Sequence, residues 1–183
     1  GDRELAEYAR KAYENAKSGK NMIALPDIGF FVNSKGNDGM EGCVIGDMTG
    51  FAAATYMRGI SWIGIPTTLL SMVDASLGGK TGIDLPEGKN LIGSFHPPKL
   101  VLADPSLLLT LSERELRSGM AEVVKHGIIS DRELFELCAR GLDWVKNNLE
   151  EVVKRAMAVK IKIIEEDPYE KGFRAALNLG HTV

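Results

Sequence analysis

The chain has 183 residues, of which 44% are hydrophobic and 26% are charged, and 22 basic and 25 acidic residues give a formal net charge of −3. These ordinary globular values exclude collagen-like, disordered and coiled-coil proteins. The lack of a basic excess argues against a nucleic-acid binder, and no apolar run in the sequence is long enough to cross a membrane. The two cysteines, Cys43 and Cys138, match no metal or redox spacing, which favours free thiols in a cytoplasmic protein.

The first predicted element is a helix over residues 3–17, where apolar side chains recur at helical spacing. Short buried strands are predicted at 21–25, 28–32, 61–65 and 100–103, with a helix rich in small residues at 46–54. This order of elements indicates an α/β layer with parallel strand pairing. The segment 75–98 is dense in glycine and proline, and we expect a long functional loop there.

After residue 111 the pattern becomes helical. Ser112 and Glu115 form a capping-box signature ahead of a helix that runs to about residue 126. Two more helices are predicted at 131–140 and 148–166, and the second of these carries an apolar stripe along one face.

Two glycine-containing segments could bind phosphate. Gly42–Asp47 is a glycine turn that opens a helix, where backbone N–H groups can hold a pyrophosphate, but it lacks the full dinucleotide fingerprint. A simple strand-to-helix turn is therefore the favoured interpretation of these residues alone. The segment 78–81 ends like a P-loop, but Asp74 occupies the position of the required earlier glycine. Lysines among glycines suit an anionic, phosphorylated ligand, and a solvated loop is the alternative.

Two polar clusters lie on predicted helices. Glu122, Lys125 and His126 share one helical face, and Glu122 could ligate a metal or pair with its neighbours, of which pairing is favoured. Arg174, Asn178 and His181 recur at i, i+4 and i+7 among apolar residues, so something must satisfy this polar stripe. A third zinc ligand to join Glu122 and His181 is not evident.

Taken together and in order, these segments resemble the 3-dehydroquinate synthase family of sugar-phosphate cyclases over about residues 44–183. The segments that carry the resemblance are GDMTGFAA (46–53), YMRGI (56–60), PTTLL (66–70), VDASLGGKT (73–81), GKNLIG (88–93), AEVVKHG (121–127) and LNLGHT (177–182). So many motifs in one order do not coincide by chance.

The resemblance implies an NAD-binding Rossmann-like α/β portion, residues 1–110, followed by part of an all-helical metal-binding domain, residues 111–183, with residues 1–41 outside the alignment. It implies NAD and zinc (or cobalt) as cofactors. The residues implied to contact NAD are Gly42, Cys43, Gly46, Asp47, Thr67, Thr68, Lys80, Lys89, Asn90 and Thr110. The implied zinc ligands are Glu122 and His181, and the implied catalytic and substrate-holding residues are Asp74, Lys80, Lys89, Lys125, Lys160, Arg174 and Asn178. Lys160 is preferred to Lys162 because it lies 14 residues before Arg174, the spacing typical of the family.

The implied function is a cytoplasmic lyase of the shikimate pathway of aromatic amino-acid biosynthesis. It converts 3-deoxy-D-arabino-heptulosonate 7-phosphate, a phosphorylated keto-acid sugar, to 3-dehydroquinate and phosphate. The steps are transient oxidation by NAD, phosphate elimination, re-reduction and intramolecular aldol closure. Members are often dimeric, so a homodimer is compatible with the resemblance, and no nucleic-acid or membrane partner is implied.

The chain departs from the family pattern in three ways. Glu41-Gly42-Cys43 replaces three glycines, which should weaken NAD binding. Most of the N-terminal sheet is missing, and the third zinc ligand, a histidine beyond His181, is absent. We therefore expect an incomplete chain with little or no synthase activity by itself. The alternatives are a related cyclase of the inosose or valiolone type and a non-catalytic fragment or fusion.

Overall fold

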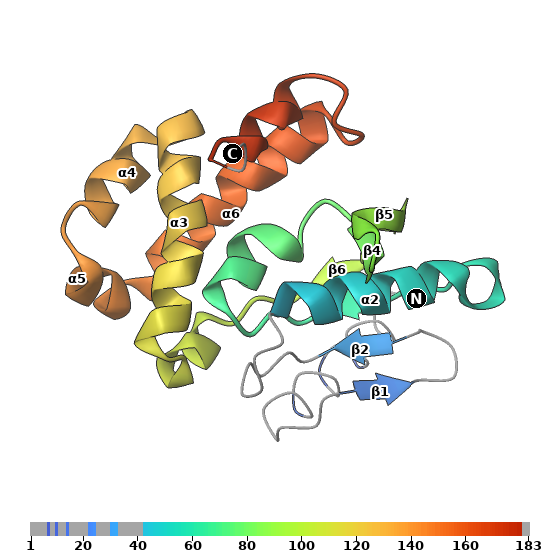
Figure 1. Cartoon of the computed structure of the whole chain (residues 1–183). Helices are drawn as coiled ribbons and strands as arrows, with labels where there is room; N and C mark the ends of the chain where they lie inside the picture. The colour runs from blue at the N-terminus through green and yellow to red at the C-terminus, as the bar shows by residue number, and fades with distance from the viewer. Residues whose placement is uncertain are drawn as a thin grey trace.

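In this computed structural model, the described residues are 42–180, two short strands at 22–24 and 30–32, and the single helical positions 7, 10 and 14. The helix predicted over 3–17 therefore lies largely outside the described residues. Figure 1 shows a small sheet with helix α2 against it, and a separate group of helices formed by the C-terminal part of the chain. This mixed arrangement confirms the predicted α/β class with a following helical portion.

The sheet has four short strands in the order β1-β2-β3-β6. They are β1 Met22–Ala24, β2 Phe30–Val32, β3 Ile63–Gly64 and β6 Leu100–Val101. The pairs β2–β3 and β3–β6 are parallel, as the alternation of strands and helices predicts, and β1–β2 is antiparallel. Helix α2, Gly42–Thr55, packs against β2 and begins four residues before the predicted start at residue 46.

The segment predicted as a long glycine-rich loop is instead an antiparallel hairpin of β4 (Lys80–Leu85) and β5 (Gly88–Phe95). Gly82 and Gly93 face each other in the register. A Cβ on Gly82 would lie 2.7 Å from the Ile92 carbonyl oxygen, and a Cβ on Gly93 would lie 2.4 Å from that of Thr81. The loop prediction was wrong because these glycines permit two strands to approach closely rather than keeping the backbone flexible.

The helical portion consists of α3 Glu113–Ser130, α4 Arg132–Cys138, α5 Leu142–Asn147 and α6 Leu149–Glu166. The Ser112 hydroxyl accepts a hydrogen bond from the Glu115 amide at 3.3 Å, which confirms the predicted start of α3, although the helix continues past residue 126. Asp131 caps α4 in the same way through the Leu134 amide at 3.0 Å. The sequence pattern did not indicate α5.

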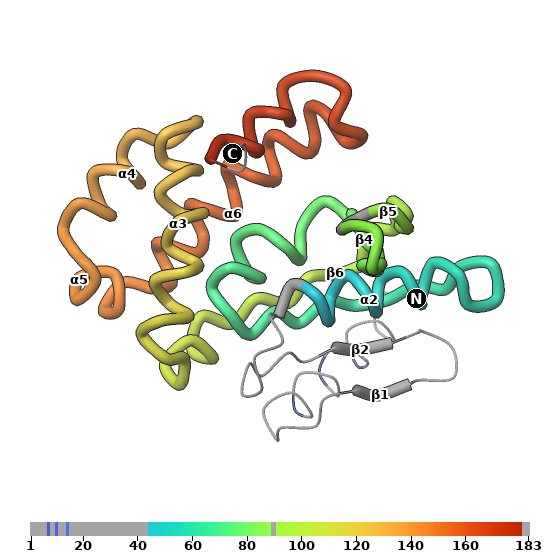
Figure 2. The backbone as a smooth tube through the Cα atoms, viewed as in Figure 1, coloured from blue at the N-terminus to red at the C-terminus, as the bar shows by residue number. Residues whose placement is uncertain are grey.

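Short irregular turns connect these elements: η1 Tyr56–Arg58, a π-helical turn η2 Ser71–Ala75, and the 3-10 helices η3 Pro105–Thr110 and η4 Phe173–Asn178. Turn η2 contacts α2, α3 and α6, so it lies where the α/β and helical portions meet (Figure 2). Leu69, Met72 and Val73, in and before η2, are fully buried and share a core with Val123 of α3 and Val152 of α6. Each such side chain contributes roughly 1.5–3 kcal/mol by its burial. None of the helices in the described part of the chain has the length and apolar character that a membrane crossing requires.

Candidate active site

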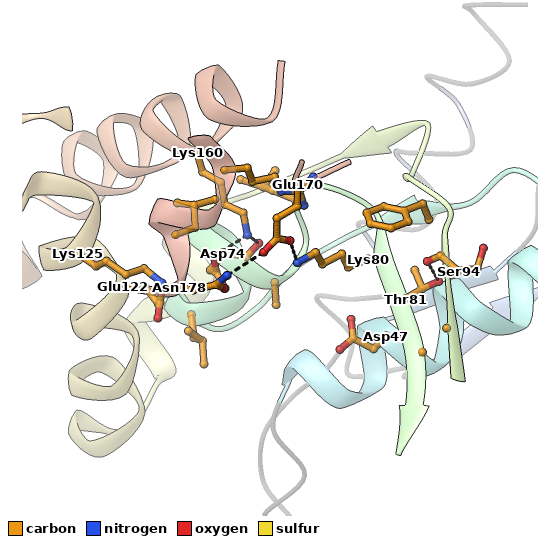
Figure 3. A pocket seen from close by; sticks show the side chains of 18 of the residues that line it. Asp47, Asp74, Lys80, Thr81, Ser94, Glu122, Lys125, Lys160, Glu170 and Asn178 are labelled. Carbon is orange, nitrogen blue, oxygen red and sulfur yellow. Dashed lines mark hydrogen bonds and ion pairs between the residues drawn. The ribbon is translucent and has the colours of Figure 1, made fainter. Parts of the chain in front are cut away.

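A pocket of about 760 Å³ lies between the β4–β5 hairpin, η2, α3, α6 and η4. This volume is within the range of small-molecule sites, roughly 300–1,000 Å³. Four cationic and four acidic side chains line it: Lys80, Lys125, Lys160, Arg174, Asp47, Asp74, Glu122 and Glu170. Figure 3 labels all of these except Arg174. Only Glu122 and Lys125 share an element, the helix α3, so folding gathers charges that are mostly far apart in the sequence.

Asp74 and Lys160 form the innermost ion pair of the pocket. The Lys160 ammonium donates to Asp74 Oδ1 at 2.6 Å and to the Asp74 carbonyl oxygen at 2.6 Å. Burial alone would raise the pKa of Asp74, but the adjacent Lys160 outweighs it, and the pKa lies below its ordinary value. Burial lowers the pKa of Lys160, and Asp74 opposes that shift. The pair joins η2 to α6.

The side chains of Glu122, Lys125 and His126 are all buried on one face of α3, which agrees with the predicted shared helical face. Lys125 pairs with Glu122 Oε2, so the ion-pair interpretation holds in this structure. His126 is fully buried, and within the described part of the chain neither of its ring nitrogens has a hydrogen-bond partner. Burial lowers the pKa of His126 to about 4, which keeps the imidazole neutral near pH 7.

These residues contribute to a group of potential metal ligands. One ligand atom each from Asp74, Glu122 and His126 lies within 4.8 Å of the others. Two carboxylates and a neutral imidazole are donors that Zn²⁺ accepts, and unpartnered buried imidazole nitrogens would gain a partner from the ion. The donor set therefore fits a divalent metal. His181, the other ligand implied by the resemblance, lies outside the described residues.

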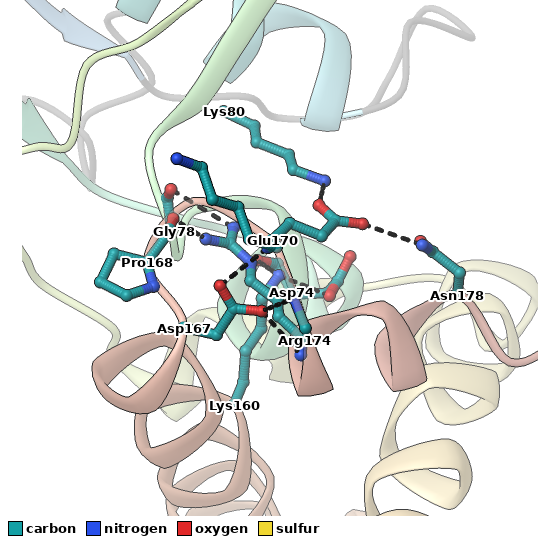
Figure 4. Close-up of polar contacts among 11 residues, drawn as sticks. Asp74, Gly78, Lys80, Lys160, Asp167, Pro168, Glu170, Arg174 and Asn178 are labelled. Carbon is teal, nitrogen blue, oxygen red and sulfur yellow. Dashed lines mark hydrogen bonds and ion pairs between the residues drawn. The ribbon is translucent and has the colours of Figure 1, made fainter.

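Arg174 is buried on η4, and its guanidinium donates to the carbonyl oxygens of Pro168 and Gly78 (Figure 4). Gly78 has a φ of +91°, and a Cβ there would lie 2.3 Å from Arg174 Nη2. Glycine is thus needed both for the backbone conformation and for the close approach of the guanidinium. Because η4 is a 3-10 helix with three residues per turn, Arg174 is buried together with Leu177, whereas Asn178 is exposed. The predicted α-helical stripe of Arg174 and Asn178 is therefore wrong.

Lys80 projects from the first residue of β4 toward the loop between α6 and η4. It pairs with Glu170 Oε2, and Asn178 Nδ2 donates to Glu170 Oε1 at 2.8 Å. Burial lowers the pKa of Lys80, and the positive charges of Arg174 and Lys160 lower it further.

Asp47 lies on α2 at the opposite side of the pocket from α3 (Figure 3). Burial raises the pKa of Asp47 to about 6, and the negative charges of Asp84 and Asp74 add to the shift. The ionised form of Asp47 is therefore disfavoured at its position in the pocket.

The other residues implied to contact NAD lie at several places. Gly42, Cys43 and Gly46 belong to the first turns of α2, so the predicted turn before the helix is part of the helix itself. Thr67 and Thr68 are buried after β3, and the Thr68 hydroxyl accepts a hydrogen bond from the Ser71 amide at 3.2 Å.

Lys89 and Asn90 belong to β5, and their side chains lie outside what the structure describes. Thr110 is on η3, where its hydroxyl donates to the Leu107 carbonyl. Thr67, Thr68 and Thr110 do not line the pocket.

Sequence reasoning missed two features of the pocket. Glu170 was not singled out, because a lone glutamate in a loop carries no pattern. The ligand potential of His126 was also missed, although its i, i+4 spacing from Glu122 is a signal that could have indicated a shared site.

Comparison with known proteins places these observations in a family. Residues 38–118 match the model described as 3-dehydroquinate synthase N-terminal, and residues 119–183 match the model described as 3-dehydroquinate synthase C-terminal. A 3-dehydroquinate synthase of Prochlorococcus marinus is 56% identical over 149 residues, which are 78% of this chain and 40% of that protein. One of Synechocystis sp. is 45% identical over 189 residues, covering 98% of this chain and 52% of that protein. That second match takes in most of the first 41 residues. The chain spans about half the length of the curated relatives it matches, or less.

Solved structures of related cyclases are also similar. A 2-epi-5-epi-valiolone synthase of Streptomyces hygroscopicus subsp. jinggangensis, with NAD⁺ and Zn²⁺ bound, has a TM-score of 0.71 and 37% identity over 76% of this chain and 41% of that one. A 2-deoxy-scyllo-inosose synthase complexed with carbaglucose-6-phosphate, NAD⁺ and Co²⁺ has a TM-score of 0.67 and 33% identity, over 76% of this chain and 40% of that one. The two family models together account for every residue from 38 to 183, and the pocket lies across their junction. The chain therefore belongs to the 3-dehydroquinate synthase family.

Proposed function

We propose that this chain forms part of the active site of a 3-dehydroquinate synthase, which converts 3-deoxy-D-arabino-heptulosonate 7-phosphate to 3-dehydroquinate and phosphate. The observation that carries the proposal is the pocket in which Lys80, Lys160 and Arg174 lie together with Asp74. A phosphorylated keto-acid carries two anionic groups, and three neighbouring cations suit it. The curated relatives supply the choice of reaction.

NAD and a divalent metal are the cofactors that we propose for this chain. Its solved relatives bind NAD⁺ together with Zn²⁺ or Co²⁺. The 14-residue helix α2 starts with N–H groups that have no partner within the helix, which suits a pyrophosphate. Glu122 and His181 would hold the metal, with His126 and Asp74 as further donors near Glu122. When bound, NAD would accept and return a hydride, and the metal would stabilise negative charge on a substrate oxygen.

The chain's own residues would act mainly by orientation and electrostatics. Arg174 presents a planar guanidinium fixed by two carbonyl groups, so it suits a carboxylate or phosphate of the substrate. Lys80 is half-exposed at the pocket edge, so an anion that enters from solvent can reach its ammonium group. The ion pair of Asp74 and Lys160 fixes both side chains before the substrate arrives, so little reorganisation is needed on binding.

We also propose the domain division at residues 110/111, with NAD bound by the first part and the metal by the second. In the described part of the chain, every strand precedes residue 102, and the α-helices α3 to α6 follow residue 112, which supports a boundary between them. A cytoplasmic location and a homodimer remain predictions from the resemblance.

A related sugar-phosphate cyclase is the second candidate. It is favoured by the likeness to the valiolone and inosose synthase structures, at 37% and 33% identity. The 3-dehydroquinate synthases are more similar in sequence, at 45% to 56% identity, so the synthase remains the first candidate.

Ligand binding separates the two candidates. Calorimetric titrations of the chain, with NAD and Zn²⁺ present, would compare 3-deoxy-D-arabino-heptulosonate 7-phosphate with carbaglucose-6-phosphate. We expect at least tenfold tighter binding of the first, which corresponds to about 1.4 kcal/mol. Lys80→Gln should weaken that binding, whereas Lys162→Gln, an exposed lysine of α6, should not. Equal binding of both compounds, or equal effects of the two variants, would contradict the proposal. Phosphate release by the chain alone is expected to be slight or absent.

A further inference from the structure

Asp167 directly follows α6, and its side chain accepts three hydrogen bonds from backbone amides further along the chain. Its Oδ1 accepts from the Lys171 amide at 2.9 Å. Its Oδ2 accepts from the Gly172 amide at 2.7 Å and from the Arg174 amide at 3.2 Å (Figure 4). These bonds lower the pKa of Asp167, the one from Lys171 most strongly, so the carboxylate is ionised near pH 7. One side chain therefore joins the end of α6 to the start of η4.

The first turn of η4 depends on this carboxylate. The N-cap residue of η4 is Gly172, which has no side chain to accept a hydrogen bond from that turn. Asp167 supplies the acceptor from a position five residues earlier. Between them, Glu170 has a φ of +55°, a conformation that costs energy in residues other than glycine and that surrounding contacts must maintain. The path of the loop between α6 and η4 is therefore fixed largely by Asp167.

Arg174 contacts the same loop through its side chain. Its guanidinium donates to the Pro168 carbonyl oxygen at 2.5 Å, and Pro168 is the residue directly after Asp167. It also donates to the Gly78 carbonyl oxygen at 3.4 Å. The Asp167 carboxylate thus binds the Arg174 backbone, and the loop that it fixes presents an acceptor to the Arg174 guanidinium.

Asp167 can affect the pocket only indirectly. Arg174 lines the pocket, whereas Asp167 is not among the described residues that line it. Arg174 is only 3% exposed, so the direction of its guanidinium is set by the groups packed around it. A planar guanidinium binds an oxyanion best through two parallel N–H groups, so a small rotation would lose part of that binding.

We propose that Asp167 is a positioning residue that orients the Arg174 guanidinium toward an anionic group of the ligand. It acts through the Arg174 backbone and the Pro168 carbonyl, and it does not touch the ligand. Its effect on ligand affinity should therefore disappear when Arg174 is replaced. The inference rests on the proposed function, because it assumes a ligand that carries a phosphate or a carboxylate.

The first measurement needs no ligand. Hydrogen exchange of the Arg174 guanidinium, followed by NMR, reports whether its bonds to the two carbonyl groups are intact, and Arg174→Lys identifies its signals by removing them. Asp167→Ala should accelerate this exchange at least tenfold. Asp167→Asn keeps one oxygen for the amides of Gly172 and Arg174, and its exchange rate should lie between those of the wild type and the alanine variant. Glu166→Ala removes an equal charge from the exposed end of α6 and should change the rate less than twofold.

The second measurement is a calorimetric titration with 3-deoxy-D-arabino-heptulosonate 7-phosphate in the presence of NAD and Zn²⁺. Asp167→Ala should weaken binding at least tenfold, and Glu166→Ala should change it less than twofold. In the Arg174→Lys background, Asp167→Ala should have no further effect, because the residue through which it acts is already replaced. A merely structural role would instead weaken binding by the same factor in both backgrounds.

The outcomes separate this inference from the proposed function. Unchanged guanidinium exchange in Asp167→Ala, or equal effects of this change on affinity in both backgrounds, would overturn the role of Asp167 and leave the proposed function intact. Binding that Arg174→Lys does not weaken, or no binding by any of the proteins, would overturn both. Faster exchange, together with a loss of affinity that requires Arg174, is the result that the proposal predicts.

Discussion

The Lys160 ammonium lies 2.6 Å from both the carboxylate and the backbone carbonyl oxygen of Asp74. The Lys160 side chain of α6 thus binds both the backbone and the carboxylate of Asp74 in η2. The side chains are 8% and 25% exposed, so water screens the pair only weakly. This arrangement fixes the turn that contacts α2, α3 and α6.

Removing one member of this pair should destabilise the fold strongly. Asp74→Asn leaves the Lys160 ammonium without its counter-ion, and we expect a loss of about 3 kcal/mol in the free energy of unfolding, the low end for a buried pair because the Asp74 side chain is 25% exposed. The double variant Asp74→Asn with Lys160→Met should lose less than the sum of the single variants, because the second change removes the stranded charge. Urea unfolding of the four proteins measures the coupling directly. Strict additivity would mean that the pair contributes no interaction energy.

Stability should also depend on the protonation of Asp47. Its pKa is about 6 in the folded chain, above the ordinary 3.8, so the folded state binds a proton more tightly than the unfolded state. The ionised carboxylate therefore destabilises the fold above pH 6, and this cost disappears as the pH falls from about 6 toward 4. Asp47→Asn should raise the free energy of unfolding at pH 7.5 by about 1 kcal/mol, after allowance for solvent screening.

The gain from Asp47→Asn should shrink between pH 7.5 and pH 5, measured by chemical unfolding at both values. Asp143→Asn removes an equal charge from an exposed position on α5 that does not line the pocket, and it should show no such change with pH. A gain for Asp47→Asn that is the same at both pH values would contradict the assignment.

Metal binding should depend on the buried face of α3. Glu122→Gln and His126→Gln each remove one donor of the proposed site, and we expect each to weaken Zn²⁺ binding by at least tenfold. Competition with a chromogenic chelator measures this without any assay of turnover. His96→Gln is the matched control, because His96 contacts the Ile60 carbonyl at 2.8 Å and is not part of the ligand group. Equal Zn²⁺ affinity of the His126 variant and the control would remove His126 from the ligand set.

Local sequence signals predicted the helices of this chain better than its glycine-rich parts. The Ser112 cap and the apolar stripe of residues 148–166 depend on neighbours within a few positions, so α3 and α6 could be predicted. The hairpin was missed because Gly82 and Gly93 have the composition of a loop, and only their cross-strand pairing explains them. The 3-10 geometry of η4 was missed because a polar stripe does not distinguish three residues per turn from 3.6.

The pocket itself could not be derived from residue patterns alone. Asp74 and Lys160 are separated by 86 positions, and no local period relates them. The resemblance to a family named both, since it transfers knowledge of a folded site to the sequence. Glu170 was missed by both routes: its importance depends on the backbone of one loop and on the position of Lys80 opposite it.

The contrast between two helical glycines gives a final prediction about packing. Gly119 of α3 lies against the segment before η2, and a Cβ there would be 2.6 Å from both Leu69 Cβ and the Leu70 amide nitrogen. Gly46 of α2 has no atom within 4 Å of the corresponding position. Alanine favours a helix over glycine by about 1 kcal/mol, so the two substitutions share this gain and differ only in their surroundings.

Gly119→Ala should therefore lower the free energy of unfolding by about 1–3 kcal/mol, because backbone in a well-packed core cannot move aside. Gly46→Ala should raise it by up to about 1 kcal/mol. Under the proposed function, the same Gly46→Ala change should weaken NAD binding, since a methyl group would then stand where the cofactor approaches α2. Thermal unfolding and NAD titration of both variants test the two effects separately. A Gly119→Ala variant as stable as Gly46→Ala would mean that α3 and the segment before η2 are less closely packed than the structure indicates.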